Sequence, residues 1–149
     1  MTIDIVEPQL NDLDALAEIF NAYRVFYHQK HNFSLARHSI QERLNQKDSK
    51  IFIAKNQENC VMDFVQLYPT FSSVSASKAW LLNDLYVDKN YRRQGIAEQL
   101  MTKAIELGKT SQAKYLALET GFDNLAAQTL YKRMGFIEQN QTMFFEYSY

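Results

Sequence analysis

The chain has 149 residues, enough for one domain with a substantial core, so we expect a single domain over residues 1–149. Apolar residues make up 46% of the chain and aromatic residues 13%, which excludes a disordered or fibrous protein. The net charge of −1 is spread over both signs, which argues against a nucleic-acid-binding surface, and the single cysteine excludes an internal disulfide.

The N-terminal half predicts a strand followed by two helices. The first residues include acidic side chains and no long apolar run, so we expect neither a signal peptide nor a membrane segment, and a cytoplasmic protein. Residues 2–6 alternate as a half-buried strand does, and residues 13–27 carry one apolar helical stripe. The three histidines that follow are expected to be exposed rather than to bind a metal; they are His28, His31 and His38.

Three strands are expected in the middle of the chain. A second, shorter helix through residues 41–46 leads to strands at 50–55 and 60–68, joined by a polar turn. Pro69 and the serine-rich residues after it predict a loop. Residues 79–87 form a near-continuous apolar run of strand length, which is typical of a strand buried on both faces.

The C-terminal half alternates between helices and strands. A helix begins after Gly95 and is expected to stop near Gly108, and a buried-type strand follows at 114–120. Asn124 precedes a further helix that Gly135 closes.

A final hairpin is expected from residues 136–139 and 142–149. The resulting order, βααβββαβαββ, predicts an α/β (α+β) fold with one mixed sheet and helices on its faces.

Gly95 lies at a strand-to-helix junction, just after Arg92 and Arg93. The first turn of a helix exposes N–H groups, and the positive end of the helix dipole attracts an anion. A glycine removes the side chain that would block the approach of a phosphate, and the small Ala97 keeps the next gap open. A tight turn with solvated arginines is the alternative interpretation of the same residues. The stretch lacks the Lys-Ser/Thr pair of a nucleotide P-loop and the three glycines of a dinucleotide site.

Two stretches resemble the signatures of the GNAT superfamily of N-acetyltransferases. "LYVDKNYRRQGIAEQLM" is similar to its acetyl-CoA motif, Arg/Gln-x-x-Gly-x-Gly/Ala, with Arg92, Gly95 and Ala97 in the fixed positions. "DNLAAQTLYKRMGF" is similar to its second signature, Asn-x-x-Ala-x-x-Leu-Tyr ending in Gly-Phe. The positions that match the second signature are Asn124, Ala127, Leu130, Tyr131, Gly135 and Phe136.

The resemblance implies a mixed, mostly antiparallel sheet in which strands 79–87 and 114–120 splay apart to admit acetyl-CoA. It implies that Tyr131 donates a proton to the departing CoA sulfur; packing in the apolar stripe of its helix is the alternative. It also implies an N–H of the first strand as the donor to the thioester oxygen. The residues expected to bind the cofactor are Leu85, Tyr86, Val87, Arg92, Arg93, Gln94, Gly95, Ile96, Ala97, Glu98, Asn124 and Tyr131.

The acceptor is expected to be an amine of a small molecule or peptide. Asn83 and Asp84 are polar residues in a buried-looking strand, where simple alternation places them on opposite faces unless the strand bulges. Polyamine acetyltransferases of the superfamily have a Glu-Asp pair here, and this chain keeps the aspartate. Tyr27 and Glu119 are further candidates for the acceptor site, whereas Phe20 and Tyr23 are expected to pack in the core.

Other functions fit parts of the same pattern. A transferase could use another acyl-CoA or a hydroxyl acceptor, and a non-catalytic CoA-binding module could act as a sensor or regulator. Homodimers are common in the family, and the aromatic residues 142–149 would suit either a subunit boundary or the last strand of one sheet.

Overall fold

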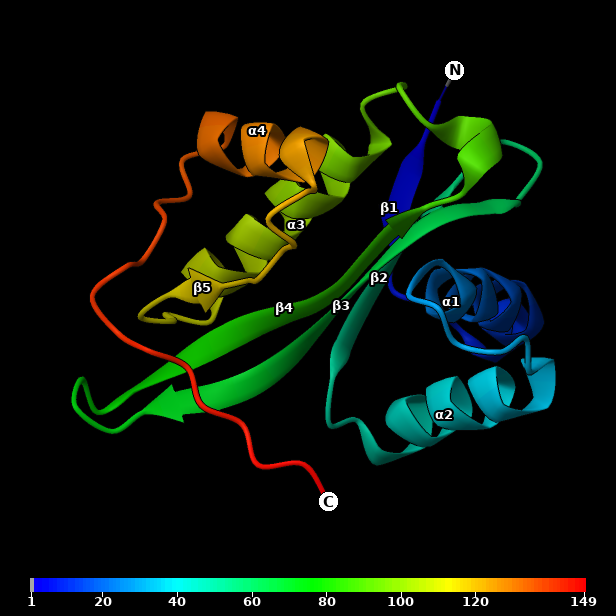
Figure 1. The fold of residues 1–149 in the computed structure, drawn as a ribbon. Helices are drawn as coiled ribbons and strands as arrows, with labels where there is room; N and C mark the ends of the chain where they lie inside the picture. The colour runs from blue at the N-terminus through cyan, green and yellow to red at the C-terminus, as the bar shows by residue number, and fades with distance from the viewer. Residues whose placement is uncertain (1) are drawn as a thin grey trace. The chain divides into compact units, whose positions relative to one another are not determined.

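The computed structural model describes residues 2–149, and the chain forms two compact units, Met1–Glu119 and Thr120–Tyr149. The described part of the first unit holds a five-stranded sheet and three α-helices, and the second unit holds one α-helix (Figure 1). The elements in chain order are β1 (Asp4–Val6), the 3₁₀ helix η1 (Leu10–Asp12), α1 (Leu13–Phe26), α2 (Phe33–Gln46), β2 (Lys50–Lys55), β3 (Val61–Ser72), β4 (Ser77–Val87), the 3₁₀ helix η2 (Lys89–Tyr91), α3 (Ile96–Thr110), β5 (Leu116–Ala117) and α4 (Leu125–Arg133).

The sheet has the strand order β1-β2-β3-β4-β5, and every neighbouring pair is antiparallel except the parallel pair β4 and β5. Helix α3 makes the crossover between these two strands, because parallel neighbours cannot be joined by a tight hairpin. The mixed, mostly antiparallel sheet predicted from the sequence is therefore confirmed.

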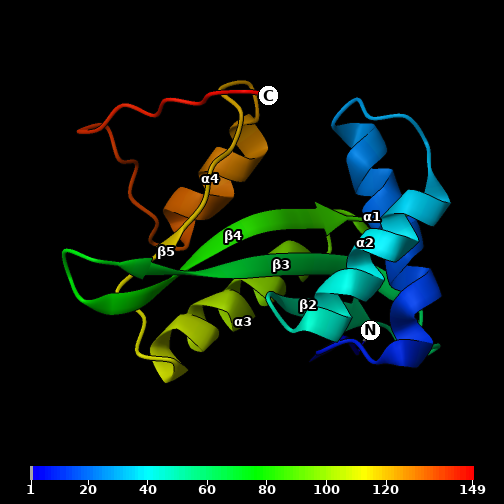
Figure 2. The ribbon, with the colours of Figure 1, turned by 90° about the horizontal axis from the view of Figure 1, so that it is seen from below.

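Helices cover both faces of this sheet. The rings and aliphatic side chains of α1 and α2 pack with Ile51, Ile53 and Phe64, whereas the Lys103 ammonium of α3 lies 5.9 Å from the centre of the Phe52 ring. Successive residues of a strand point to opposite faces, so α3 lies on the face away from α1 and α2. Figures 1 and 2 show this arrangement within the first unit.

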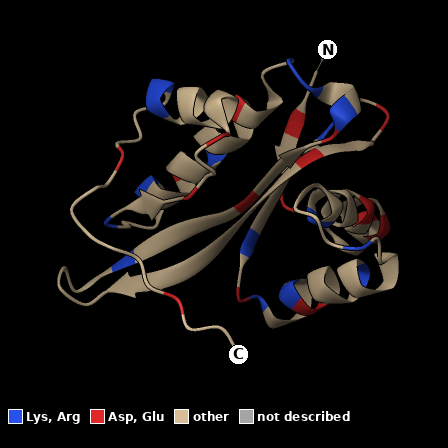
Figure 3. Cartoon of the chain, in the orientation of Figure 1, with Lys and Arg blue, Asp and Glu red and all other residues tan. Residues whose placement is uncertain are grey.

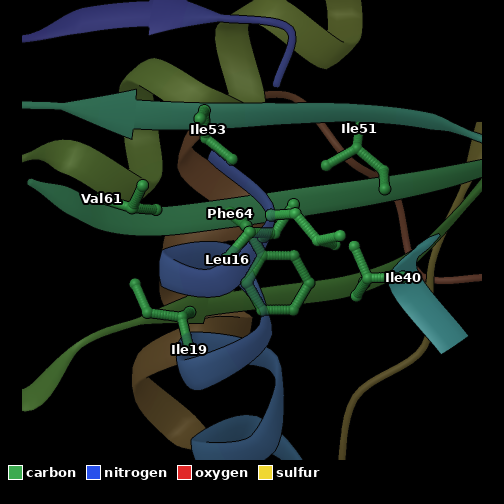
Figure 4. Close-up of a cluster of buried hydrophobic side chains, with 8 residues drawn as sticks. Leu16, Ile19, Ile40, Ile51, Ile53, Val61 and Phe64 are labelled. Atoms are coloured by element: carbon green, nitrogen blue, oxygen red, sulfur yellow. The ribbon is translucent and has the colours of Figure 1, made fainter. Parts of the chain in front are cut away.

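The core on the α1 and α2 face is built from branched aliphatic residues around one aromatic ring (Figure 4). Phe64 is fully buried, and the rings of Phe20 and Tyr23 meet it edge-on at 5.9 and 5.6 Å between centroids. Truncating such a buried phenylalanine to alanine typically costs about 3–5 kcal/mol. The members of this cluster are Leu13, Leu16, Ile19, Ile40, Ile51, Ile53, Val61 and Phe64.

Asp63 is an unusual feature of the central strand β3. Its side chain is fully buried on the α3 face, and neither carboxyl oxygen has a hydrogen-bond partner among the described residues. Burial raises the pKa of Asp63 well above its ordinary value, and the nearby N–H of Phe64, which does not reach hydrogen-bond geometry, opposes this only in part. The folded protein therefore holds a proton that the unfolded chain releases above pH about 4, so this residue lowers stability as the pH rises.

Two predictions about where a strand and a helix end were wrong. Strand β3 runs through Pro69 to Ser72, where a loop was expected. Because β2 pairs with β3 only as far as Leu67, one edge of β3 is open at Pro69, and the missing N–H of proline breaks no ladder there. Helix α3 continues past Gly108 to Thr110, because this glycine does not adopt the left-handed conformation that ends a helix.

The prediction of a final hairpin was also wrong. Among the described residues, neither helix nor strand is found after Arg133, although the aromatic alternation of residues 142–149 is typical of a strand. A strand needs a neighbouring backbone with which to pair, and the second unit contains no strand that could provide one. The aromatic side chains of this segment are consequently exposed; they are Phe144, Phe145, Tyr147 and Tyr149.

Candidate cofactor and acceptor sites

The segment between β4 and α3 has two residues in the left-handed region. Arg93 has φ 63° and Gly95, at the N-cap of α3, has φ 74°. A left-handed non-glycine residue costs of order 1–3 kcal/mol, and such strain tends to persist at functional sites. Gly95 provides no side-chain cap, so the N–H groups of the first turn of α3 can be bonded by an anion instead. This geometry suits a phosphate.

The side chains around this loop separate into two kinds. Arg93, Gln94 and Gly95 are exposed, whereas Ile96 is buried in the core, so Ile96 could contribute to a ligand site only through its backbone. Ala97 is half-buried and Glu98 is exposed. In Figure 3 the ribbon of the basic residues in this segment, between β4 and α3, is coloured blue.

Arg92 is folded back onto the end of β4. Its Nε donates to the carbonyl oxygen of Val87 at 3.3 Å, and its guanidinium lies 5.7 Å from the centre of the Tyr86 ring. A guanidinium at this distance from an aromatic face is a cation–π contact. Arg92 therefore links residues 92–98, which we call the anion loop, to the aromatic residues on the α1 face of the sheet.

The edge of β4 is open beside the loop. The β4–β5 ladder contains only the pairs Trp80–Leu116 and Leu81–Ala117, so β5 is shorter than the expected strand 114–120. Beyond Leu81, β4 continues to Val87 with β3 on one side and no strand of residues 2–119 on the other. The half-buried residues along this edge, which were expected to pair with the cofactor, are Leu85, Tyr86 and Val87.

A bulge in β4 brings Asn83 and Asp84 together. Gln66 pairs with Asp84 and Leu67 with Leu82, so Asn83 is the additional residue. The bulge interrupts simple alternation, and the Asn83 amide Nδ2 donates to Asp84 Oδ1 at 3.1 Å. The expectation of opposite faces was therefore wrong for this pair, and the alternative of a hydrogen-bonded bulge is confirmed.

Asp84 is a buried carboxylate surrounded by neutral donors. It is 5% exposed, and Gln66 Nε2 donates to its Oδ2 at 2.8 Å. The Tyr23 hydroxyl also lies close to it. Within residues 2–119 no lysine, arginine or histidine forms an ion pair with Asp84. Buried carboxylates normally pair with a cation, so this site suits a positively charged ligand.

Tyr23 was expected to pack in the core, and no sequence pattern indicates its proximity to Asp84. Burial, and then the negative charge of Asp84, raise the pKa of Tyr23 well above its ordinary value. The exposed ring of Tyr27 packs edge-on against Tyr23 with 5.0 Å between centroids, which places this predicted acceptor residue beside the same cluster. Glu119 is exposed beyond the end of β5, and the structure records no interaction between it and Asp84.

The second unit contains the residues of the other sequence signature. Asn124 is the N-cap of α4, and its side chain accepts from the N–H of Ala127 at 3.2 Å. Gly135 has φ 98° and follows the end of the helix, as predicted for a glycine C-cap. Tyr131 is half-buried, and its ring lies 6.0 Å from that of Phe136. Tyr131 thus has a packing role within its unit, which leaves its predicted chemical role untested.

The remaining candidates lie outside these sites. His28, His31 and His38 are exposed as expected, and Cys60 is exposed after a turn that Asn56 stabilises. Among residues 2–149 there is no group of three or more His, Cys, Asp or Glu side chains that could hold a metal ion. In the same part of the chain no helix has both the length and the apolar character needed to cross a membrane.

The model of the acetyltransferase (GNAT) family matches residues 13–136, and this chain belongs to that family. It is 36% identical over 136 residues to an uncharacterized N-acetyltransferase, YhfO, of Bacillus subtilis (strain 168), with 91% of each chain covered. It is 31% identical over 101 residues to human N-acetyltransferase 8, which covers 68% of this chain and 44% of the relative.

Solved structures agree with this assignment. A crystal structure of a probable acetyltransferase has a TM-score of 0.93 and 35% identity, covering 98% of this chain and 97% of the other. The aminoglycoside acetyltransferase AAC(6')-Iy, in complex with the bisubstrate analogue CoA-S-monomethyl-acetylneamine, has a TM-score of 0.83 at 18% identity, covering 99% of each chain. At that identity the second structure shows the shared fold alone. The chain is therefore an N-acetyltransferase with the GNAT fold.

Proposed function

We propose that this enzyme transfers the acetyl group of acetyl-CoA to a primary amine of a small molecule or peptide, by direct attack in a ternary complex. The observation that supports an amine acceptor is the environment of Asp84, a buried carboxylate with neutral donors and no ion-pair partner within residues 2–119. An alkylammonium provides the missing positive charge. We also propose that residues 1–149 act as one acetyltransferase domain.

The anion loop would hold the pyrophosphate of acetyl-CoA. Its left-handed Arg93 and Gly95 expose the N–H groups of the first turn of α3, and Arg92 can exchange its contact with the Tyr86 ring for the phosphate charge. We assign backbone contacts in this turn to Gln94, Ile96, Ala97 and Glu98. Asn124 is assigned to the cofactor from the family signature.

The open edge of β4 would hold the pantetheine arm. An amide-containing chain can add to a sheet edge as a further strand does, here along Leu85, Tyr86 and Val87. A backbone N–H of this edge would donate to the thioester oxygen as negative charge develops on it, which is typically worth a few kcal/mol. Backbone donors of this kind are unaffected by most side-chain substitutions.

The acceptor would be bound by Asp84, with Asn83 holding the carboxylate and Tyr27 lining the approach. The ammonium releases one proton to water, and its nitrogen then attacks the thioester carbon and forms the new C–N bond. As the C–S bond breaks, the nitrogen loses a second proton, which balances the proton that the departing sulfur gains. We assign Tyr131 as the donor of a proton to the departing sulfur, because a phenol is protonated at neutral pH. Glu119 remains a weaker candidate for the acceptor site.

Thiol release from acetyl-CoA tests this function across polyamines, amino acids, aminoglycosides, basic peptides and alcohols. We expect turnover with one amine class, and more than tenfold lower turnover for Tyr131→Phe with acetyl-CoA affinity retained. Tyr147→Phe makes the same chemical change at an exposed tyrosine of the same unit and should keep wild-type turnover.

Each other outcome points to a different function. Turnover with alcohols alone would indicate a hydroxyl acceptor, and activity restored by a longer acyl-CoA would indicate another acyl donor. Cofactor binding with no thiol release from any acceptor would indicate a CoA sensor. Wild-type turnover in Tyr131→Phe would remove Tyr131 from the mechanism.

We further propose that the enzyme is a homodimer. Large exposed aromatic patches commonly mark interfaces, and the C-terminal segment exposes Phe144, Phe145 and Tyr147.

A further inference from the structure

We infer that Tyr23, on α1, is a positioning residue for the acceptor amine and acts through the carboxylate of Asp84. The inference rests on the proposed amine acetyltransfer and adds a residue that neither sequence signature contains. Three features of the first unit support it: the place of the Tyr23 ring on the sheet, the packing of other aromatic rings around it, and the neutral character of the amide donors to Asp84 within residues 2–119.

The ring of Tyr23 lies on β3 and β4 next to Asp84. Phe64 and Tyr86 are directly opposite each other in the ladder, and the neighbouring pair on the same face is Gln66 and Asp84. Tyr23 contacts both members of the first pair, with ring centroids 5.6 Å from Phe64 and 6.1 Å from Tyr86. Its hydroxyl lies close to Asp84 in the second pair.

The neighbours of Tyr23 fix the direction of this hydroxyl. The ring also packs against Phe20 at 6.0 Å and Tyr27 at 5.0 Å, so four aromatic rings surround it. A ring held on several sides has few alternative rotamers. Because its raised pKa keeps the phenol protonated, the hydroxyl remains a donor throughout the working pH range.

Within residues 2–119, the side chains that donate hydrogen bonds to Asp84 are the amides of Gln66 and Asn83. Gln66 is itself held, since its Oε1 accepts from the Ser49 hydroxyl at 2.9 Å. These partners orient the carboxylate without neutralising it, so its charge is left for the ammonium of the acceptor. Helix α1 thereby participates in amine recognition through a residue that need not touch the amine.

Binding of butylamine to the complex of the protein with CoA, followed by NMR chemical shifts, measures acceptor affinity without turnover. Tyr23→Phe keeps the ring and its four contacts, so the variant should fold with a thermal midpoint close to wild type. We expect its dissociation constant for butylamine to rise about tenfold or more, because the hydroxyl beside the buried carboxylate is lost, while acetyl-CoA affinity stays within about twofold. Tyr115→Phe, at a 43% exposed tyrosine of the same unit, is the matched control and should bind butylamine as wild type does.

A double-mutant cycle with Asp84→Asn tests whether Tyr23 acts through Asp84. In the Asp84→Asn background, Tyr23→Phe should change butylamine affinity by less than about twofold. Unchanged butylamine affinity in the single variant Tyr23→Phe, or fully additive effects in the cycle, would overturn the inference. Butylamine binding by a wild-type protein that releases no thiol would instead contradict the proposed function and leave the role of Tyr23 standing.

Discussion

Alanine at Gly95 should weaken the fold and the cofactor site, whereas alanine at Gly108 of the same helix should stabilise the protein. Gly95 has φ 74°, and a Cβ there would meet no atom within 4 Å, so the cost comes from the backbone alone. A left-handed conformation costs an L-residue roughly 1–2 kcal/mol. A Cβ at Gly108 also meets nothing within 4 Å, and no positive φ opposes it, so alanine should gain about 0.5–1 kcal/mol there.

Urea denaturation, monitored by circular dichroism, measures the free energy of unfolding of both variants and of wild type. We expect their free energies of unfolding to differ by about 1.5–3 kcal/mol, the sum of the two effects. Calorimetric titration with acetyl-CoA should show weaker binding for Gly95→Ala alone, because relief of the strained φ moves the N–H groups of the first turn. Gly108→Ala controls for the addition of a methyl group to α3.

Two results would refute this reasoning. If both alanine variants shift stability in the same direction, the left-handed conformation is not the reason for glycine at position 95. If Gly95→Ala lowers stability but binds acetyl-CoA as wild type does, the loop has a structural role and the anion site lies elsewhere.

The remaining predictions concern a buried acid and the C-terminal segment. Asp63→Asn should remove the loss of stability that this residue causes as the pH rises. In denaturation experiments, the free energy of unfolding of the variant relative to wild type should increase above pH 4 by no more than about 1.4 kcal/mol per pH unit. A difference that stays constant with pH would contradict the raised pKa of Asp63. Light scattering should find a dimer for wild type and a monomer for Phe144→Ser combined with Phe145→Ser, and a dimer in both would exclude this segment from the interface.

Much of the fold could be predicted because local patterns and tertiary packing agree. The apolar stripe of residues 13–27 predicted α1, and the two strand-length segments joined by the polar turn predicted β2 and β3. Gly135 and Asn124 were predicted as helix caps because capping depends on residues within one turn of each other. The end of β3 was missed because it depends on pairing with β2, which stops at Leu67 and leaves Pro69 at an open edge. Pairing between strands cannot be deduced from the residues next to Pro69.

The candidate site divides in the same way. The loop at Gly95 was predicted because its requirement is local, a left-handed residue at the start of a helix after two arginines. The strain at Arg93 was missed, since an arginine gives no compositional sign of a positive φ. The prediction of a hairpin at residues 136–149 was wrong, because alternating apolar and polar residues indicate only which side chains would share a face of a strand. The alternation does not provide a strand with which to pair.

The sequence by itself determined the family, the order of the elements through α4 and the position of the anion loop, because each depends on neighbouring residues in fixed spacing. Tertiary structure alone decided the surroundings of Asp84 and Asp63. The bulge at Asn83 changes which side chains share a face, and it arises from pairing between β3 and β4. Tyr23 meets Asp84 only because α1 packs across these two strands, so a contact between residues 61 positions apart follows from packing rather than from any local pattern.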